Sequence, residues 1–374
     1  MQSTTSAVSP YVQILLRNMG FSQTLVGIVL ACGQIAATVI PLAIGAMVDR
    51  RGSVKRTIFM CLGCSIAAFV CMLLKLPVFP LAALYTISQA AFKCFDPILD
   101  SYFTSAFRGD PGTYSNVRAT GTIGYVIMLT FFALTGFPSK DSNVQIITNI
   151  IVYFLLFGLF VAIAPKPVTS EKSKDEEHER FRLAWLDKSF YVLMIIISFS
   201  KIAMGVIDIM LGSYMTEVLH LGDSFSLFVA FGAFCEFFVF IIFGRLLKKN
   251  KITIWGLLML SFIGIFVRLT LYYTTSSIAM FLVAQSLHGF SFGCNHIAAT
   301  SYIGKTVNPK HRNLAMSIYF SVAINFSNML GVLFGGMLID MVGYNGVFKI
   351  YSILPLISAG LCIYFKKLIN SKLI

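Results

Sequence analysis

Long apolar runs recur along almost the whole chain and are separated by short stretches of polar and charged residues. Each run holds about 20 residues, and a helix of that length crosses the ~30 Å hydrocarbon layer of a membrane. The pattern therefore predicts an all-α polytopic membrane protein. We expect eleven full spans, near residues 23–48, 57–76, 79–107, 116–137, 144–164, 189–215, 224–247, 252–273, 277–304, 313–338 and 345–365.

One long polar stretch interrupts the pattern between the fifth and the sixth of these spans. Residues 165–188, PKPVTSEKSKDEEHERFRLAWLDK, carry six basic and six acidic side chains. We predict an N-terminal helical half over residues 1–164, a cytoplasmic linker over 165–188 and a C-terminal helical half over 189–374. Two helical halves joined by a polar linker are typical of a transporter built from repeats.

The composition excludes a soluble domain, because 57% of the residues are hydrophobic, 12% are charged and the mean hydropathy is +0.81. The net charge of +13 could indicate a nucleic-acid partner, but its distribution argues against one. Lys and Arg gather in alternate loops, whereas the intervening loops carry Arg17, Lys75 and Lys140. This positive-inside pattern reports topology, so we expect no nucleic-acid partner and a cytoplasmic C-terminus.

The start of the chain departs from this topology. The loop charges place Arg17 outside and residues 49–56 inside, so one more span should precede Arg17. Residues 1–18 are too short and too polar to cross alone, although SPYVQILL is typical of the outer end of a helix. We expect about 12 membrane helices with the first apparently truncated. A mis-assigned or truncated gene start is the favoured explanation, and a genuinely short helix is the alternative.

The eight cysteines all lie within apolar segments. Cys61 and Cys64 form a C-x-x-C pair, but no second ligand pair or flanking polar residue accompanies them. We interpret the cysteines as small apolar packing residues and expect neither a metal site nor a cofactor.

Two charges stand on either side of the turn RGDPG at 108–112, within apolar sequence. A charge at bilayer depth is costly and marks function by default. Asp100 lies ~13 Å and Arg118 ~9 Å from the turn along their helices, so two antiparallel helices would hold them face to face. A purely structural role for this ion pair is an open alternative. The same alternative holds for the possible pairs of Lys93 with Asp96 and of Lys201 with Asp208.

The loop at 45–56, GAMVDRRGSVKR, resembles the major facilitator superfamily signature G-x-x-x-D-R-x-G-R-K. The matching residues are Gly45, Asp49, Arg50 and Gly52, with the basic pair displaced to Lys55 and Arg56. The resemblance implies the major facilitator fold of two six-helix pseudo-repeats, in which this loop latches the outward-facing conformation. The equivalent loop of the second half, FGRLLKKNK, lacks the Asp and is interpreted as a decayed copy.

The stretch YSNVRATGTIGY at 114–125 resembles the Y-G-R-x-R-x-x-G-S-x-G-[WF] segment of the oligosaccharide:H+ symporter branch, which contains lactose permease and phenylpropionate-permease-like proteins. In that branch the Arg binds substrate, and an acidic residue eighteen positions earlier pairs with it. Arg118 and Asp100 hold these positions, and Tyr125 matches an aromatic that stacks on the sugar ring. The resemblance implies a substrate site formed by Asp96, Asp100, Arg118 and Tyr125.

The stretch SLHGFSFGCNHIAATSYI at 286–303 resembles the L-H-G-x-[TS]-F-G-x-x-H motif of the same branch. His288 matches the proton-coupling His of that motif, and Asn295 and His296 follow on the same side, so Asn295 joins the predicted substrate site. Arg268 matches the buried Arg of the branch. Glu236 matches the G-x-x-x-E pattern of the phenylpropionate and nucleoside members.

This chain departs from lactose permease at three positions. It has Ala233 where that permease carries a carboxylate, Ser291 in place of the proton-releasing Glu, and Ser327 in place of a Lys. The lactose-type coupling site is therefore not reproduced. We expect proton coupling to depend on Glu236, with Arg268 and His288 controlling its protonation.

These observations predict a secondary active transporter that works by alternating access, with a small-molecule substrate and a proton as co-substrate. Arg118 and Asp100 would bind substrate hydroxyls. We therefore expect a sugar or glycoside first, a nucleoside second and a small aromatic acid third. The carboxylate beside Arg118 would repel a bare anion. We expect a monomer in the lipid bilayer of the cytoplasmic (inner) membrane.

Other classes fit the sequence less well. An enzyme would need a catalytic cluster at the membrane interface, but the ionisable residues lie within the spans, so we expect no enzymatic activity. A multidrug efflux antiporter should carry a repeated Gly-Pro motif in the fifth helix, and ATGTIGYVIM has no proline. A non-transporting sensor on the same scaffold stays open.

Overall fold

The computed structural model describes residues 1–21, 23–51, 53–74, 76–107, 110–139, 141–164, 186–221 and 225–370. It is 87% helical, and no strand occurs in these described ranges. Within the described residues, ten helices are long and apolar enough to cross a membrane: Ile28–Arg50, Val54–Cys71, Val78–Ala106, Pro111–Thr135, Asn143–Ile163, Lys188–Gly212, Leu227–Lys248, Ile254–Thr274, Pro309–Ile339 and Met341–Tyr364. The predicted all-α polytopic class is confirmed.

The segment predicted as a span over 277–304 is not one regular helix. It consists of α12 (Ile278–Ser286), the π-helix η4 (Gly289–Cys294) and α13 (Asn295–Thr306). A π-helical turn holds an extra residue, which shifts the face presented by everything after it. Hydropathy does not register that shift, so the sequence predicted one uninterrupted helix here.

The helices form two compact units, and each unit takes in a stretch from the other half of the sequence. The first unit contains Met1–Ala106, Gly124–Arg182 and Asn308–Ser321, and the second contains Phe107–Ile123, Leu183–Val307 and Val322–Ile374. The helix α7 (Pro111–Thr135) contributes to both units. The predicted boundaries between the sequence halves at 164 and 188 stay a prediction.

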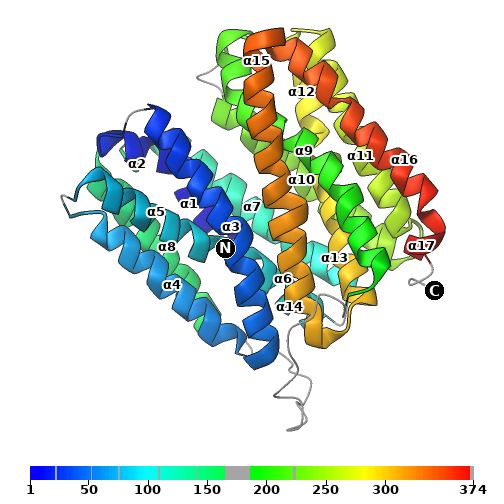
Figure 1. Cartoon of the computed structure of the whole chain (residues 1–374), viewed down its shortest axis with the longest axis horizontal. Helices are drawn as coiled ribbons and strands as arrows, with labels where there is room; N and C mark the ends of the chain where they lie inside the picture. The colour runs from blue at the N-terminus through cyan, green and yellow to red at the C-terminus, as the bar shows by residue number, and fades with distance from the viewer. Residues whose placement is uncertain are drawn as a thin grey trace. The chain divides into compact units, whose positions relative to one another are not determined.

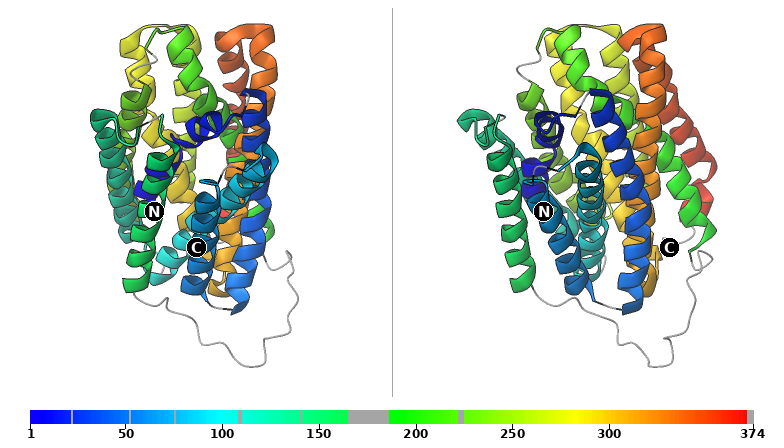
Figure 2. Two further views of the ribbon diagram at one scale, coloured as in Figure 1. Left: turned by 90° about the vertical axis from the view of Figure 1, so that its left-hand side faces the viewer. Right: turned by 60° about the vertical axis from the view of Figure 1, so that its left-hand side comes forward.

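The first unit is built around the N-terminal helices. They are α1 (Gln2–Val8), α2 (Val12–Asn18), α3 (Gln23–Arg51), α4 (Val54–Cys71), α5 (Val78–Lys93), α6 (Phe95–Ala106) and α8 (Asn143–Ile163), with α14 (Arg312–Ile318) from later in the sequence. Figure 2 shows the short α1 beside α8, and the two are in contact. Aromatic side chains fill the core, where Phe154 packs on both Phe69 and Phe92.

The second unit contains the later helices. They are α9 (Lys188–Glu217), α10 (Phe225–Lys248), α11 (Ile254–Thr274), α12, η4, α13, most of the π-helix η6 (Tyr319–Phe326), α15 (Ser327–Tyr351), α16 (Ile353–Tyr364) and α17 (Lys366–Asn370). Figure 1 shows α9, α15 and α16 side by side, in agreement with their contacts. Gly205 of α9 permits this packing, because a Cβ there would lie 2.6 Å from the backbone oxygen of Asn328.

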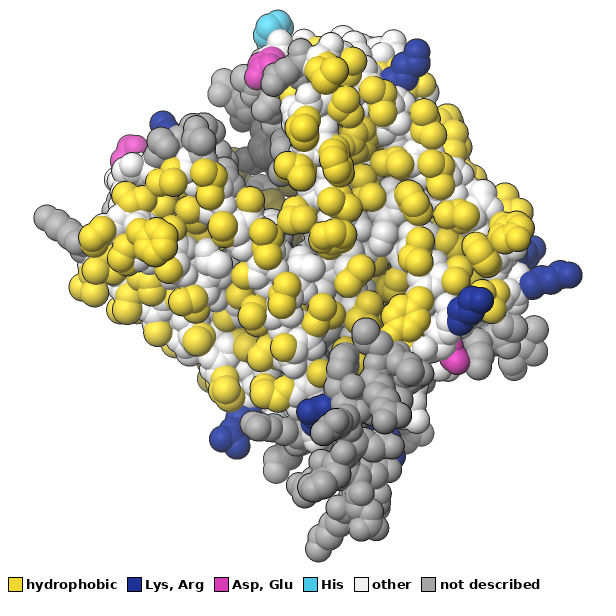
Figure 3. Space-filling model, viewed as in Figure 1, with side chains coloured by type: hydrophobic (Ala, Val, Ile, Leu, Met, Phe, Trp, Pro, Cys, Tyr) yellow, Lys and Arg dark blue, Asp and Glu magenta, His cyan; other side chains and the backbone are white. Residues whose placement is uncertain are grey.

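Hydrophobic side chains cover much of the face shown in Figure 3, and the Lys and Arg side chains visible there lie toward its margins. Large apolar residues such as Phe79, Leu134 and Phe160 are exposed on the surface. A soluble protein would bury such residues, whereas lipid tails solvate them. The surface is therefore that of a multi-pass membrane protein.

Candidate functional site

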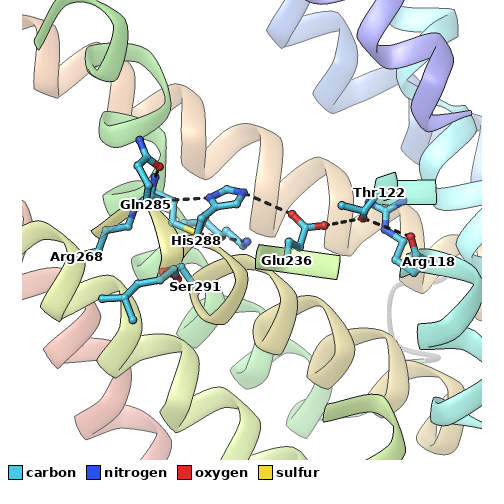
Figure 4. A network of polar contacts seen from close by, with 10 residues as sticks. Arg118, Thr122, Glu236, Arg268, Gln285, His288 and Ser291 are labelled. Carbon is cyan, nitrogen blue, oxygen red and sulfur yellow. Dashed lines mark hydrogen bonds and ion pairs between the residues drawn. The ribbon is translucent and has the colours of Figure 1, made fainter. Parts of the chain in front are cut away.

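A series of polar side chains crosses the second unit from α7 through α10 to α12 and α11 (Figure 4). Thr122 Oγ1 donates a hydrogen bond to Glu236 Oε1 at 3.0 Å. The other carboxylate oxygen, Glu236 Oε2, lies 3.5 Å from Nε2 of His288. Nδ1 of His288 lies 3.2 Å from Nη1 of Arg268. One carboxylate thus joins a helix from the first half of the sequence to helices from the second half.

Close packing between α10 and η4 brings Glu236 and His288 together. A Cβ on Gly289 would lie 2.9 Å from Cγ2 of Val239 and 3.0 Å from the backbone of Cys235, so this position accepts only glycine without displacement. His288 precedes Gly289 and Glu236 follows Cys235 in the sequence. The glycine contact therefore sets the distance between the two titratable side chains.

Arg268 is held on three sides within the unit. Its Nε donates to the hydroxyl of Tyr272 at 2.9 Å, and its Nη2 donates to Oε1 of Gln285 at 2.9 Å. The third contact is with Nδ1 of His288. Tyr272 follows Arg268 by one helical turn on α11, so it fixes the guanidinium from the same helix face.

The contact with Arg268 determines the tautomer of His288. A guanidinium donates hydrogen bonds and accepts none, so Nδ1 of His288 must be the acceptor. The neutral ring then carries its proton on Nε2, the atom that faces Glu236. Arg268 donates to Nδ1, the ring nitrogen that carries no proton. The group in this network that can accept an additional proton is therefore the carboxylate of Glu236.

Burying these charged side chains costs free energy unless they are paired and hydrogen-bonded to one another. Glu236 is 7% exposed and Arg268 is 2% exposed. Buried charges persist in proteins when they are paired and hydrogen-bonded. Glu236 has Thr122 and His288 as direct partners, and the charge of half-buried Arg118 also interacts with it.

The structure brings four predicted site residues, Arg118, Glu236, Arg268 and His288, into the second unit as neighbours. Asn295 lies in the same unit on α13 and is fully buried. Among the residues that the structure describes, neither Oδ1 nor Nδ2 of Asn295 has a hydrogen-bond partner. The assigned roles of all five residues stay predictions.

The other predicted substrate residues belong to the first unit. Asp96 and Asp100 lie on α6, where Asp96 is half-buried and Asp100 is buried. Tyr125 is half-buried in the part of α7 that belongs to this unit. The pairing of Asp100 with Arg118 joins residues of different units and stays a prediction.

Sequence reasoning missed Thr122, Tyr272 and Gln285. Thr122 and Tyr272 each follow a predicted Arg by four residues, so they share a helix face with Arg118 and Arg268. That spacing could have indicated both of them. Gln285, in α12, lies three residues before His288 and shares a helix face with it, so spacing could have indicated Gln285 as well.

A stacked series of rings continues beyond His288. Its ring lies parallel to Phe292 at 6.1 Å, and Phe292 lies parallel to His296 at 5.5 Å. The hydroxyl of Tyr114 on α7 lies 2.9 Å from Nε2 of His296. Lys201, buried in α9, places Nζ 4.7 Å from the centre of the Phe292 ring. The side chain of Asp208, its predicted partner, lies outside the described residues.

The loop motif lies at a helix terminus in the first unit. Asp49 accepts hydrogen bonds at the start of α14, from Asn313 N at 3.2 Å, Asn313 Nδ2 at 2.7 Å and Leu314 N at 2.8 Å. A carboxylate stabilises a helix N-terminus because free N–H groups and the helix dipole meet there. Gly45 is buried, Arg50 is exposed, and Gly52 lies outside the described residues.

The helical fold, with its apolar spans, is that of the major facilitator transporters. The chain belongs to the MFS_1 like family, whose sequence profile matches residues 1–350. The predicted major facilitator fold is confirmed, whereas the oligosaccharide:H+ symporter branch within it stays a prediction.

Individual proteins with similar sequence or structure agree with this class. An uncharacterized transporter of Bacillus subtilis (strain 168), YwbF, is 26% identical over 302 residues, which cover 79% of this chain and 73% of YwbF. The structure of the nucleoside transporter NupG matches with a TM-score of 0.61 and 16% identity over 98% of this chain and 98% of that chain. The E. coli fucose:proton symporter FucP matches with a TM-score of 0.73 and 14% identity over 97% and 96%.

Proposed function

We propose that this protein is a secondary active transporter that moves a small polar solute, a sugar or glycoside, across the cytoplasmic membrane by alternating access and H+ symport. The observation that carries the proposal is the position of Glu236. Its carboxylate contacts α7 through Thr122 and the start of η4 through His288, so its protonation state acts on helices from both sequence halves.

Proton binding would change the partners of Glu236. The charged carboxylate attracts Arg118 and accepts hydrogen bonds on both oxygens. When the carboxyl is protonated, its charge is lost and its attraction for Arg118 falls. Arg118 can then turn to substrate. Substrate binding and proton binding support each other in this scheme, as symport requires.

The solute would be bound by Arg118 together with Asp96, Asp100, Tyr125 and Asn295. The guanidinium and the carboxylates suit the hydroxyl groups of a polyol, and Tyr125 offers a stacking face for a sugar ring. The fully buried amide of Asn295 has a free donor and a free acceptor among the described residues, which suits a polar ligand.

A nucleoside is the second candidate substrate. Glu236 stands at the carboxylate position that the sequence shares with nucleoside and phenylpropionate members, whereas the lactose permease position holds Ala233. Both carboxylate oxygens of Glu236 have partners in the polar network, Thr122 and His288. A nucleoside also contains a ribose, so it presents the same hydroxyl chemistry to Arg118.

Uptake into proteoliposomes tests the proposal. Purified protein is reconstituted, and uptake of a panel of labelled sugars, glycosides and nucleosides is measured with and without an inward proton gradient. We expect at least one sugar or glycoside to accumulate, and the gradient to raise its internal level. Accumulation of a nucleoside alone would favour the second candidate.

Two results would contradict the proposal. Absence of uptake for every sugar, glycoside and nucleoside would exclude the substrate class. Uptake that is independent of the gradient would exclude H+ symport and leave a facilitator. Empty liposomes and liposomes that contain the Arg118→Lys variant serve as controls, because Lys retains the charge but not the planar fork of Arg118.

A further inference from the structure

The helices α16 and α17 meet at a break at one end of the second unit. Phe365, which lies between them, has left the helical conformation (φ −90°, ψ 11°). Beyond it α17 contacts α9, α11 and α16, and its Ile369 is fully buried. Lys366 and Lys367, the first two residues of α17, are exposed. The buried side of α17 therefore anchors two lysines at the edge of the unit.

Trp255, the second residue of α11, contacts both sides of this break. Its Nε1 donates a hydrogen bond to the backbone oxygen of Cys362 at 3.2 Å. The last four carbonyls of a helix lack partners within it, and Cys362 holds one of these carbonyls in α16. Nζ of Lys366 lies 4.3 Å from the centre of the Trp255 ring, so the ring face attracts the ammonium. One side chain thus caps the end of α16 and positions a lysine.

Positive charge is not balanced at this edge of the unit. Lys251 lies two residues before Thr253, the N-cap of α11, and is exposed. Among the residues that the structure describes, no carboxylate forms an ion pair with Lys251, Lys366 or Lys367. Figure 3 shows Lys and Arg side chains at the right-hand margin, where Figure 1 places α17. An anionic partner would supply the missing charge.

The same edge lies at the level of the membrane surface. Trp255 stands at one end of the membrane span Ile254–Thr274, where tryptophans of membrane proteins are enriched. In the last turn of α16, Ile363 is 57% exposed and Tyr364 is 79% exposed, which suits contact with acyl chains. The lysines of α17 follow directly. The surface changes from apolar to cationic within a few residues, as a phospholipid changes from acyl chain to phosphate.

We propose that Trp255, Lys251, Lys366 and Lys367 form a binding site for an anionic phospholipid of the phosphatidylglycerol type. The phosphate lies among the ammonium groups, and the acyl chains follow the exposed end of α16. Trp255 is a positioning residue, because it holds Lys366 in place. The predicted orientation puts this edge in the cytoplasmic leaflet. The site is independent of the proposed substrate and of proton coupling.

Charge selects the class of lipid. Each lysine near an anionic membrane surface raises association by roughly fivefold, and salt screens this attraction. Phosphatidylcholine carries the same phosphate but also a trimethylammonium group, which the lysines repel. The site should therefore prefer the anionic lipid, and the preference should be larger at low salt.

Trp255 itself can report which lipid contacts it. The sequence holds two tryptophans, Trp255 and Trp185, and Trp185 lies outside the described residues. A Trp185→Phe background leaves Trp255 as the single tryptophan. This protein is reconstituted into two sets of vesicles with the same mixture of phosphatidylglycerol and phosphatidylcholine, and the sets differ in which lipid carries brominated acyl chains. Bromine quenches tryptophan fluorescence on contact, so the two sets give the ratio of the two association constants.

We expect brominated phosphatidylglycerol to quench Trp255 more than brominated phosphatidylcholine, and Lys366→Gln to lower this preference by about fivefold. Lys366→Arg should keep the preference, since Arg retains the charge and stacks on an aromatic ring. Lys367→Gln should also lower it, and this change leaves the contact between Lys366 and Trp255 in place.

Lys349→Gln is the matched control. Lys349 is an exposed lysine of the same unit, but it lies just before α16 begins, whereas Lys366 follows the end of α16. The control makes the same charge change outside the proposed site and should leave the preference unchanged.

Three results would overturn the lipid site. The first is equal quenching by the two brominated lipids. The second is an unchanged preference in both Lys366→Gln and Lys367→Gln, or an equal loss in Lys349→Gln, which would indicate an effect of net charge alone. The third is loss of the preference in inorganic phosphate but not in sodium chloride of equal ionic strength, which would assign the lysines to a free phosphate ion.

Discussion

Glu236 accepts contacts on both carboxylate oxygens, and the two partners differ in what they can supply. Thr122 supplies a hydroxyl hydrogen from α7, and His288 presents a ring nitrogen whose proton is fixed there by Arg268. Substitution of Thr122 removes the partner of Oε1 and keeps that of Oε2, and substitution of His288 does the reverse. The network can therefore be tested one residue at a time.

Substitution of Glu236 by Gln keeps the size and most hydrogen bonds of the side chain but removes its titration. We expect Glu236→Gln to abolish accumulation driven by a proton gradient, while exchange of labelled for unlabelled substrate at equal concentrations continues. Both are measured in proteoliposomes across a range of external pH. Glu217→Gln, at an exposed carboxyl on α9, should behave as the native protein. Retained accumulation in Glu236→Gln would assign coupling to another residue.

Substitution of Thr122 by Val removes the hydroxyl but keeps the shape of the side chain. We expect Thr122→Val to shift the pH dependence of uptake, because one buried hydrogen bond contributes about 1 kcal/mol, or roughly fivefold in an equilibrium constant. Thr122→Ser should retain the native profile. The control is Thr120→Val, at an exposed position of the same helix, and an equal shift there would contradict the role of Thr122.

At the scale of the elements, a glycine of the π-helix η4 determines how closely η4 packs on α10. Gly289 stands where a Cβ would contact both the side chain of Val239 and the backbone of Cys235. Backbone atoms yield less than the end of a flexible side chain, so the helices themselves must move apart if the glycine is replaced. The distance between His288 and Glu236 depends on the same packing.

Substitution of Gly289 by Ala should lower stability by about 1–3 kcal/mol, the usual cost of overpacking. We expect a lower apparent melting temperature in detergent, together with weaker dependence of uptake on the proton gradient. Gly360→Ala in α16 is the control, because a Cβ there meets nothing within 4 Å. A native melting temperature in Gly289→Ala would show that η4 and α10 tolerate the extra atom.

At the scale of the whole molecule, the positive charges of alternate loops predict an orientation in the membrane. The C-terminal tail carries Lys366, Lys367 and Lys372, so it should be cytoplasmic. A fluorescent protein that matures only in the cytoplasm should fluoresce when fused to the C-terminus, whereas alkaline phosphatase inserted at Lys140 should be active outside. The reverse pattern would invert the topology and place the loop motif at Asp49 outside.

Much of the fold could be predicted from sequence, because each helix is specified by a local run of apolar residues. The exceptions are the segments at 277–304 and 313–338, where the π-helices η4 and η6 interrupt the α-helix and the apolar composition gives no sign of them. The site was predicted less completely. Glu236, Arg268 and His288 were identified by motif spacing, but Thr122 and Gln285 were missed, because an uncharged polar residue on an apolar helix is common and carries no signal by itself.

The sequence by itself determined the membrane class, most of the helical spans and the few charged residues within them, and its loop charges predict an orientation. The tertiary structure decided which of these residues meet. Thr122 and Glu236 are 114 positions apart, Asp110 and Lys248 are 138 apart, and Asp49 and Asn313 are 264 apart. Periodicity and hydropathy are local properties, whereas such pairs depend on how closely whole helices pack, and glycines at the helix contacts control that packing here.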